Sequence, residues 1–301
     1  VMDIDPSLEP DDTPVDCNYV PAEEKVLLSL KGKKFKVLNV KSDRNDSLFS
    51  GTLAKSLFST PEAFKSVVEN RLKKLDGKLG DFSEDQDFLN NALAILKTHK
   101  GSKTNKYKEL VKFLNEGKAK TKLQRVVVFT EYRKSIQALF DALKKEFKLK
   151  SSKKDNEFDP KAEIVLLHAG IPEATQKEVI DSFGTKNSKI QILLATDVAS
   201  EGLNLHYNCN RLVHYDVPWS LIRIEQRNGR INRYGQEKQP IIRYLISRSD
   251  LDELSKLHEG HVSNRLVEKY REVKKQLGDT GRQMGLFDPL AEADLVQKSF
   301  G

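Results

Sequence analysis

The chain has 301 residues, enough for one or two domains with a substantial core, and carries a net charge of +7 with 32% charged residues. This balance favours an anionic partner, nucleic acid first among them. The only cysteines, Cys17 and Cys209, show no paired spacing, which argues against a disulfide framework or a zinc site and fits a reducing cytoplasm. No apolar run approaches the roughly 18 residues of a membrane span, so we expect no membrane partner.

The first 24 residues hold eight acidic side chains, four prolines and no Lys or Arg. This composition, without an apolar period, predicts a solvated linker or tail, and an acidic interaction arm is the functional alternative. A short extended entry near Cys17 and a helix from Pro21 to Leu30 follow. We assign 1–47 to this acidic linker and entry segment.

Residues 48–122 form the predicted helical region. Thr60-Pro61 is a helix start, followed by apolar residues at helical spacing up to Leu75. Further helices are predicted around 88–96 and 107–114. Between Lys97 and Arg125 there are ten Lys or Arg and two acids, a pattern typical of a phosphate-binding surface or, alternatively, of a solvated helix face.

From residue 123 to 250 apolar strands alternate with amphipathic helices. The predicted strands are 126–130, 163–168, 190–196, 212–216 and 241–246. Such a pattern predicts an α/β lobe with a parallel sheet covered by helices on both faces. For 251–301 we expect one or two helices packed on the lobe and then a disordered or loosely packed tail.

Two stretches carry the chemistry: ILLATDVASEGLNL at 192–205 and IEQRNGRINRYGQ at 224–236. The first is a buried strand that ends in polar residues, and the carboxyl edge of an open α/β sheet is where ligands bind. In the second, Arg230 and Arg233 are three residues apart, which predicts that both guanidiniums share one helix face and can meet a phosphate. A solvated basic helix face is the alternative.

The pair resembles motifs V and VI of the superfamily 2 helicases, and the form Q-x-x-G-R-x-x-R-x-G-Q is most similar to the Swi/Snf branch. The E-G-L-N variant is similar to bacterial members, such as the RNA-polymerase-associated ATPase and helicases of phage defence. Residues 57–72 resemble the helical insertion between the two motor lobes of such proteins. The resemblance implies a RecA-like lobe at 123–250.

A competent ATPase needs a phosphate-cradling loop G-x-x-x-x-G-K-[ST] and a strand-end acid for magnesium, and the sequence contains neither. The chain also begins at Val1. We therefore expect an upstream RecA-like lobe in the same polypeptide, which holds most of the ATP and Mg²⁺. By the resemblance, the present chain supplies the second side of the ATP cleft and is inactive alone.

The resemblance also implies roles for single residues. Arg233 is the expected arginine finger, Arg230 its partner on the γ-phosphate, and Gln226 the residue that couples nucleotide to the lobe interface. The expected cofactor-binding residues are Asp197, Gly202 and Asn204, with Asn204 near the ribose.

Three strand-end residues resemble the nucleic-acid contacts of the family: Thr130, His168 and Thr196. Contacts to backbone phosphates read no base identity, so binding is expected to be independent of sequence. A helix N-cap is the alternative for Thr130, and a hydrogen-bonded strand-end histidine for His168. Pro172 and Gln176 depart from the Ser and Arg that many relatives carry after His-Ala-Gly.

Three functions therefore compete. The first is the second lobe of an ATP-dependent translocase on double-stranded DNA that remodels protein complexes. The second is a strand-separating helicase on DNA or RNA. The third is a module that binds nucleic acid or a protein partner without ATPase activity.

Overall fold

The computed structural model describes residues 9–38, 47–76, 81–119, 122–154, 157–197 and 205–251, together with Leu266 and Glu268. Gly202 and Asn204 lie outside the described residues, as does most of the predicted C-terminal segment 251–301. In the described part of the chain, no helix is long and apolar enough to cross a membrane.

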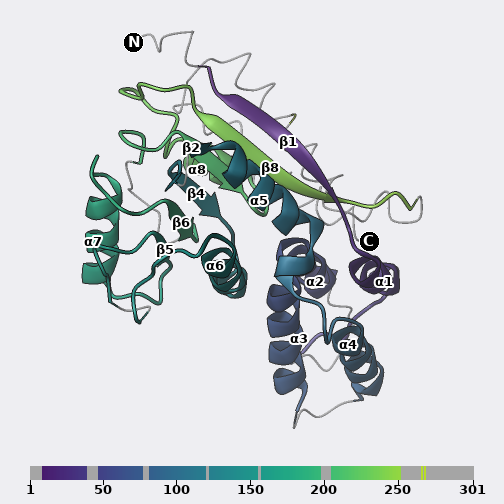
Figure 1. Cartoon of the computed structure of the whole chain (residues 1–301). Helices are drawn as coiled ribbons and strands as arrows, with labels where there is room; N and C mark the ends of the chain where they lie inside the picture. The colour runs from purple at the N-terminus through teal and green to yellow at the C-terminus, as the bar shows by residue number, and fades with distance from the viewer. Residues whose placement is uncertain are drawn as a thin grey trace.

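Six parallel strands form the central sheet, in the order β1-β8-β7-β4-β6-β5 (Figure 1). The strands are β1 (Asp11–Asn18), β4 (Val126–Phe129), β5 (Ile164–Leu167), β6 (Ile192–Ala195), β7 (Arg211–His214) and β8 (Ile241–Arg248). The predicted α/β class with a RecA-like parallel sheet is confirmed, and all five predicted strands are present.

The helices of the lobe are α5 (Asn105–Glu116), α6 (Arg133–Phe147), α7 (Glu173–Phe183) and α8 (Leu221–Asn228). Successive strand residues point to opposite faces of the sheet, so the side chains of β4 contribute to two apolar cores. Val126 and Val128 pack in the core that includes α5 and α6, whereas Val127 and Phe129 pack in the core that includes α7 and α8. This double burial explains why the strands read as continuous apolar runs.

The prediction of a linker was wrong for residues 11–16, which form β1 at one edge of the sheet together with the extended entry predicted near Cys17. Its acidic side chains, which suggested solvation, pair with arginines of β8: Asp11 with Arg243 at 2.7 Å and Asp16 with Arg248 at 2.7 Å. These partners are more than 230 positions away in sequence, so no local pattern could indicate them. Pro14 is tolerated because β1 is an edge strand.

A separate helical unit lies at the end toward which β1 and β8 run (Figure 1). It contains α1 (Pro21–Leu30), α2 (Ser47–Ser59), α3 (Pro61–Leu75) and α4 (Ser83–Ile95) around its own apolar core. The predicted start of α3 is confirmed, because the Ala63 amide donates to the hydroxyl of the N-cap Thr60 at 3.1 Å. Trp219 packs against both this core and the sheet core, which joins the helical unit to the lobe.

Three short elements lie between α4 and β4. The turn η2 (Gly101–Lys103) precedes α5, and strands β2 (Lys118–Ala119) and β3 (Lys122–Leu123) form a small antiparallel pair before β4. The basic run from Lys97 to Arg125 is therefore spread over a turn, a helix and this pair of strands.

Candidate functional site at the carboxyl edge of the sheet

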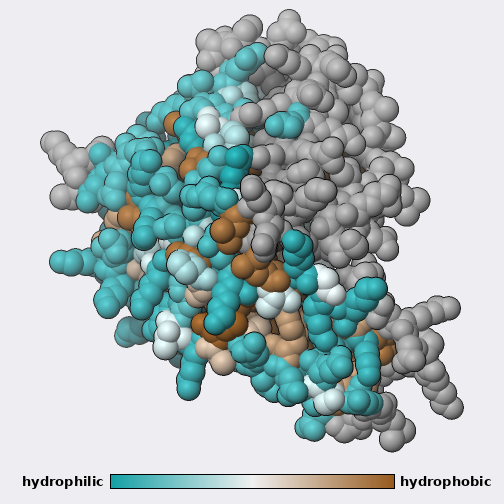
Figure 2. Space-filling model, turned by 90° about the vertical axis from the view of Figure 1, so that its right-hand side faces the viewer, coloured by the Kyte–Doolittle hydropathy of each residue, from teal (hydrophilic) through white to brown (hydrophobic). Residues whose placement is uncertain are grey.

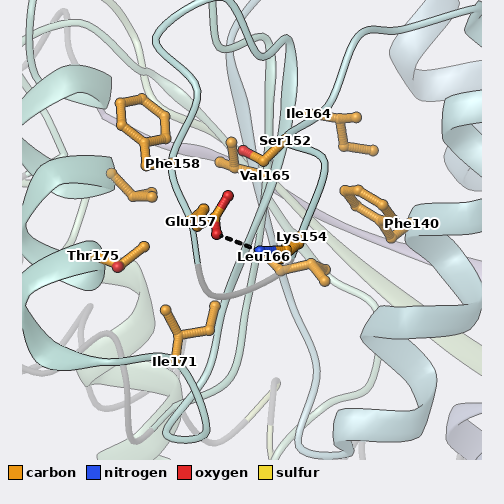
Figure 3. Close-up of a pocket in the computed structure, with 11 residues that line it drawn as sticks. Phe140, Ser152, Lys154, Glu157, Phe158, Ile164, Val165, Leu166, Ile171 and Thr175 are labelled. Carbon is orange, nitrogen blue, oxygen red and sulfur yellow. Dashed lines mark hydrogen bonds and ion pairs between the residues drawn. The ribbon is translucent and has the colours of Figure 1, made fainter.

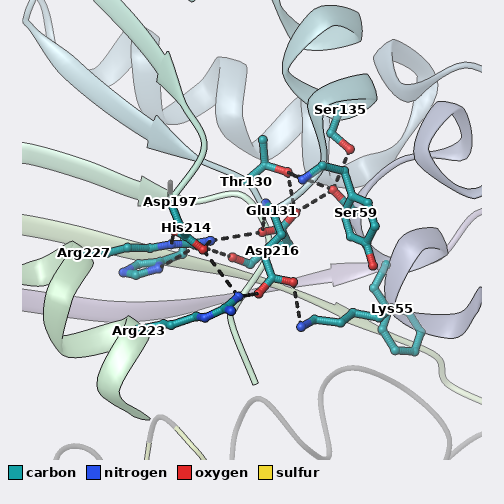
Figure 4. Close-up of polar contacts among 12 residues, drawn as sticks. Lys55, Ser59, Thr130, Glu131, Ser135, Asp197, His214, Asp216, Arg223 and Arg227 are labelled. Carbon is teal, nitrogen blue, oxygen red and sulfur yellow. Dashed lines mark hydrogen bonds and ion pairs between the residues drawn. The ribbon is translucent and has the colours of Figure 1, made fainter. Parts of the chain in front are cut away.

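The carboxyl ends of β4, β6 and β7 meet at a buried polar network (Figure 4). Its centre is Asp216, 2% exposed, two residues beyond β7. The carboxylate accepts hydrogen bonds from the hydroxyl of Thr130 at 2.5 Å, from the hydroxyl of Ser59 at 2.6 Å and from the Glu131 amide at 3.0 Å. Ser59 ends α2, so the network joins the helical unit to the strand ends.

Arg227 of α8 is the second centre of the network, with a side chain only 2% exposed. Its Nε and Nη2 donate to the two carboxylate oxygens of Asp197 at 2.5 and 3.0 Å, and its Nη1 donates to the backbone carbonyl of Asp216 at 2.8 Å. Burial lowers the pKa of Arg227, but the charge and hydrogen bonds of Asp197 outweigh it and raise the pKa overall. The guanidinium is therefore a permanently charged clamp.

The sequence reading missed Arg227. A signal was present, because Leu221 and Ile224 mark the buried face of the helix and Arg227 lies three residues further on the same face. A buried arginine needs an acidic partner. Asp197 was expected at the nucleotide, and the structure shows its carboxylate in contact with Arg227.

His214, at the end of β7, links the clamp to the rest of the sheet. Burial first, and the charge of Arg227 second, hold the pKa of His214 well below its usual range. The ring is therefore neutral, and the hydrogen-bond network assigns the proton to Nε2, which donates to Asn228 Oδ1 at 2.8 Å. The Asn228 amide in turn donates to the hydroxyl of Tyr244 at 2.8 Å. This chain fixes the end of α8 against β7 and β8.

An outer ring of charges surrounds the network on its solvent side. Glu131 contacts Lys55 of α2 at 2.6 Å and Arg223 of α8 at 3.2 Å. Figure 2 faces the end of the molecule toward which β1 and β8 run; its described side chains are mostly hydrophilic, with hydrophobic ones gathered near the middle.

The two arginines expected on one helix face lie elsewhere, so that prediction was wrong. Helix α8 ends at Asn228 and is followed by Gly229, and both Arg230 and Arg233 lie in the turns after it. The backbone forms turns there instead of continuing the helix. The Arg230 amide donates to the Arg227 carbonyl, three residues back, at 3.1 Å, and Gly235 adopts a φ of 89°. Arg233 is exposed and Arg230 is half-buried.

The structure does bring the two sequence motifs together. The Leu205 amide donates to the Arg230 carbonyl at 3.1 Å, and Asp197 is bound by Arg227, so both described ends of the first motif contact the second. The side-chain amide of Gln236 donates hydrogen bonds to the carbonyls of Cys209 and Ile231 and so anchors the end of the turn. Gln226 is exposed on α8.

The expected nucleic-acid contacts differ in their surroundings. Thr130 is fully buried in the Asp216 network, and the N-cap of α6 is Tyr132, so the alternative of Thr130 as an N-cap is wrong. His168 is 3% exposed, and its Nδ1 accepts the Gly170 amide at 3.0 Å. Thr196 follows β6 next to the end of β5, where its amide donates to the Leu167 carbonyl at 3.0 Å.

Arg133, which the sequence reading did not select, lies beside the His168 turn. A Cβ placed on Gly170 would be 2.8 Å from Nη1 of Arg133 and 3.1 Å from Cε1 of His168. The guanidinium and the imidazole therefore both lie against Gly170, and a side chain at position 170 would displace the Arg133 guanidinium. The Arg133 side chain is exposed at the amino end of α6, a position suited to an anion.

A small apolar cavity lies apart from this network, between α6 and α7 against β5 (Figure 3). Its volume of about 20 Å³ is room for no more than a water molecule. The ion pair of Lys154 and Glu157 at 2.8 Å is its only charged lining among the described residues. Within the same described ranges, no group of three or more His, Cys, Asp or Glu is placed to hold a metal ion.

Comparisons with known proteins match the lobe. Residues 105–235 match the family model of the helicase conserved C-terminal domain. An uncharacterized ATP-dependent helicase, YqhH of Bacillus subtilis strain 168, is 38% identical over 91 residues, which are 30% of this chain and 15% of that protein. The RNA polymerase-associated protein RapA of Yersinia enterocolitica is 30% identical over 97 residues, 32% of this chain and 10% of RapA.

Solved structures support the fold independently of sequence. The crystal structure of the C-terminal part of the Fun30 ATPase domain superposes with a TM-score of 0.51 at 16% identity. The match covers 89% of this chain and 99% of that structure, so it includes the helical unit as well as the lobe. By contrast, the matched segments span only a small part of the two relatives found by sequence.

Proposed function

We propose that the chain is the second motor lobe of an ATP-dependent nucleic-acid translocase of the superfamily 2 helicases, Swi/Snf-like branch, because residues 105–235 match the helicase conserved C-terminal domain and the two relatives are an ATP-dependent helicase and RapA. The preferred track is double-stranded DNA, with RNA as the alternative. One observation carries the proposal: the buried Arg227, clamped at the carboxyl edge of the sheet where α/β folds bind ligands, directly precedes the turn that carries Arg230 and Arg233.

Arg233 is the proposed arginine finger, because its side chain is exposed in a turn whose backbone is anchored on both sides. Arg230, half-buried beside it, is the second cation for the γ-phosphate. Preorganised positive charge stabilises the charge that develops in phosphoryl transfer and contributes on the order of 10³ in rate. ATP and Mg²⁺ would be held mainly by an upstream lobe of the same polypeptide.

The remaining residues of the two motifs have supporting roles in this proposal. Gln226, exposed on α8, would couple nucleotide to the interface between the lobes. Gly202 and Asn204 would approach the nucleotide. Asp197 would act on it indirectly, through its hold on Arg227.

The nucleic-acid side would use the ends of β5 and β6. We assign phosphate contacts to Thr196, to the turn of His168 and Gly170, and to the exposed guanidinium of Arg133. Such contacts position a duplex without reading its bases. For Thr130 we propose a positioning role, because its hydroxyl is buried against Asp216.

The test is ATP hydrolysis by the intact parent protein with and without duplex DNA, for wild type and Arg233→Ala. The expected result is DNA-stimulated turnover that falls on the order of 10³-fold in the variant. Lys145→Ala, an exposed cation at the far end of α6, is the matched control and should keep wild-type turnover. If wild type shows no turnover on duplex DNA, single strands or RNA, the motor proposal fails and a binding module without ATPase activity takes its place.

A further inference from the structure

A second cavity lies at the opposite edge of the sheet, where the strands begin. It has a volume of about 500 Å³ and is lined by the segments before β4, β6, β7 and β8. Strand β4 is four residues long, so this edge lies roughly 13 Å from the carboxyl edge, at about 3.3 Å per residue. Neither the candidate fingers nor the proposed nucleic-acid contacts line it.

The cavity is strongly basic. Its lining includes Lys122, Arg125, Lys186 and Lys238, with Glu237 as the single acid among its lining residues. Arg125 is occupied, because its guanidinium donates to the carbonyls of Phe183, Lys186 and Ser188. In the part of the chain that the structure describes, the ammonium groups of Lys122, Lys186 and Lys238 have no acidic partner within 4 Å. Three lysine ammonium groups without an acidic partner line one cavity, and this arrangement favours binding of a phosphate.

The walls of the cavity are fixed by hydrogen bonds to the backbone. Asn208 donates to the Gly184 carbonyl at 2.6 Å, Asn210 to the Gln239 carbonyl at 2.9 Å, and Gln236 to the Cys209 carbonyl at 3.1 Å. The Cys209 thiol beneath them is fully buried, and burial raises its pKa to about 11, so it stays neutral and unreactive. The hollow is therefore preformed, which lowers the entropic cost of binding.

Tyr207 adds an aromatic surface to the same lining, and 67% of it is exposed. Its ring packs on His206, with ring centroids 3.9 Å apart, so one side is supported by a buried side chain. An exposed tyrosine held in this way is a platform on which a base stacks, and stacking is indifferent to base identity. The volume is also within the range of small-molecule sites.

We propose that this cavity binds a nucleoside phosphate unit, with its base on Tyr207 and its phosphate among Lys122, Lys186 and Lys238. The unit is either a free nucleotide or the end of a nucleic-acid strand, since both present the same chemistry. The site is additional to the ATP cleft and to the track at the carboxyl edge.

The test is fluorescence titration of the full chain with etheno-AMP and, separately, with a 5′-phosphorylated oligothymidylate. Tyr207→Ala should weaken binding on the order of 10-fold or more, which is a typical loss for one stacked base. Replacing Lys122, Lys186 and Lys238 together by Gln should weaken it further and flatten its salt dependence. Binding of etheno-AMP alone identifies a free nucleotide, and tighter binding of the oligothymidylate that Tyr207→Ala weakens identifies a strand end.

Tyr234→Ala is the matched control, because Tyr234 is equally exposed at 66% but does not line the cavity. Arg133→Ala, at the opposite edge of the sheet, should leave binding of etheno-AMP unchanged even though it weakens binding to duplex DNA. Absence of binding for both probes, or equal losses for Tyr207→Ala and Tyr234→Ala, would overturn the proposal. Neither result would bear on the motor function.

Discussion

The guanidinium of Arg227 makes a two-point contact with the carboxylate of Asp197, although the residues are 30 positions apart and belong to different motifs. Asp197 is the last described residue before segment 198–204, and Arg227 is nearly the last residue of α8. The contact therefore ties the chain that leaves β6 to the chain that leads to Arg230 and Arg233. The two motifs are thus held together by a two-point ion pair.

Loss of this pair should destabilise the fold. Arg227→Ala leaves Asp197 without its main partner and removes a bond to the Asp216 carbonyl, so we expect the free energy of unfolding to fall by about 3 kcal/mol or more. Arg223→Ala on the same helix is the control, with a loss of about 0–1 kcal/mol because that side chain is 55% exposed. Urea unfolding measures both, and equal losses would contradict the buried clamp.

His214 should make stability depend on pH. Its pKa is lowered in the folded protein by burial and by Arg227, so below about pH 6.5 the unfolded chain takes up a proton that the folded protein does not. Stability from this group is present above pH 6.5 and is lost on acidification. Between pH 7 and 5.5, wild type should lose about 1 kcal/mol more than His214→Gln in urea unfolding. Parallel curves for the two proteins would contradict a neutral His214.

The basic run from Lys97 to Arg125 should divide into structural and surface members. Lys106 is 4% exposed and donates to the Phe58 carbonyl at 2.7 Å, so Lys106→Met should cost about 1–3 kcal/mol and leave the salt dependence of DNA binding unchanged. Lys103 and Lys108 are exposed, and their double change to Glu should weaken binding and flatten its salt dependence. Duplex titrations at several salt concentrations measure this. Unaltered binding in the double variant would mean that the run is only a solvated face.

Arg133→Ala should weaken binding of the parent protein to duplex DNA on the order of 10-fold, equally for unrelated sequences, because a phosphate contact reads no bases. Lys145→Ala, on the same helix away from the His168 turn, should bind as wild type. Anisotropy titrations with two unrelated duplexes give the comparison. A loss confined to one duplex would exclude a backbone contact by Arg133.

Local sequence patterns were sufficient for much of the fold. Continuous apolar runs such as Val126–Phe129 predicted buried parallel strands, and Thr60-Pro61 predicted the start of α3, because each signal depends on neighbours a few positions away. The spacing of Gln226, Gly229, Arg230 and Arg233 likewise showed a resemblance to helicases, and residues 105–235 match the helicase conserved C-terminal domain.

Tertiary structure decided what depended on distant partners. The acidic segment 11–18 pairs with β8, whose arginines neutralise Asp11 and Asp16, and the bonds of Asn228 to His214 and Tyr244 hold the last turn of α8 against the sheet. Thr130 was placed in a buried network by Asp216 and Ser59, 86 and 71 positions away. The sequence by itself determined the parallel sheet, because apolar runs depend on local periodicity, and its motifs showed the resemblance to helicases that the match of residues 105–235 supports. Only the folded chain decided which charges are buried in pairs and which remain exposed. The cost of burying a charged side chain is offset by a partner distant in sequence, and no local pattern indicates that partner.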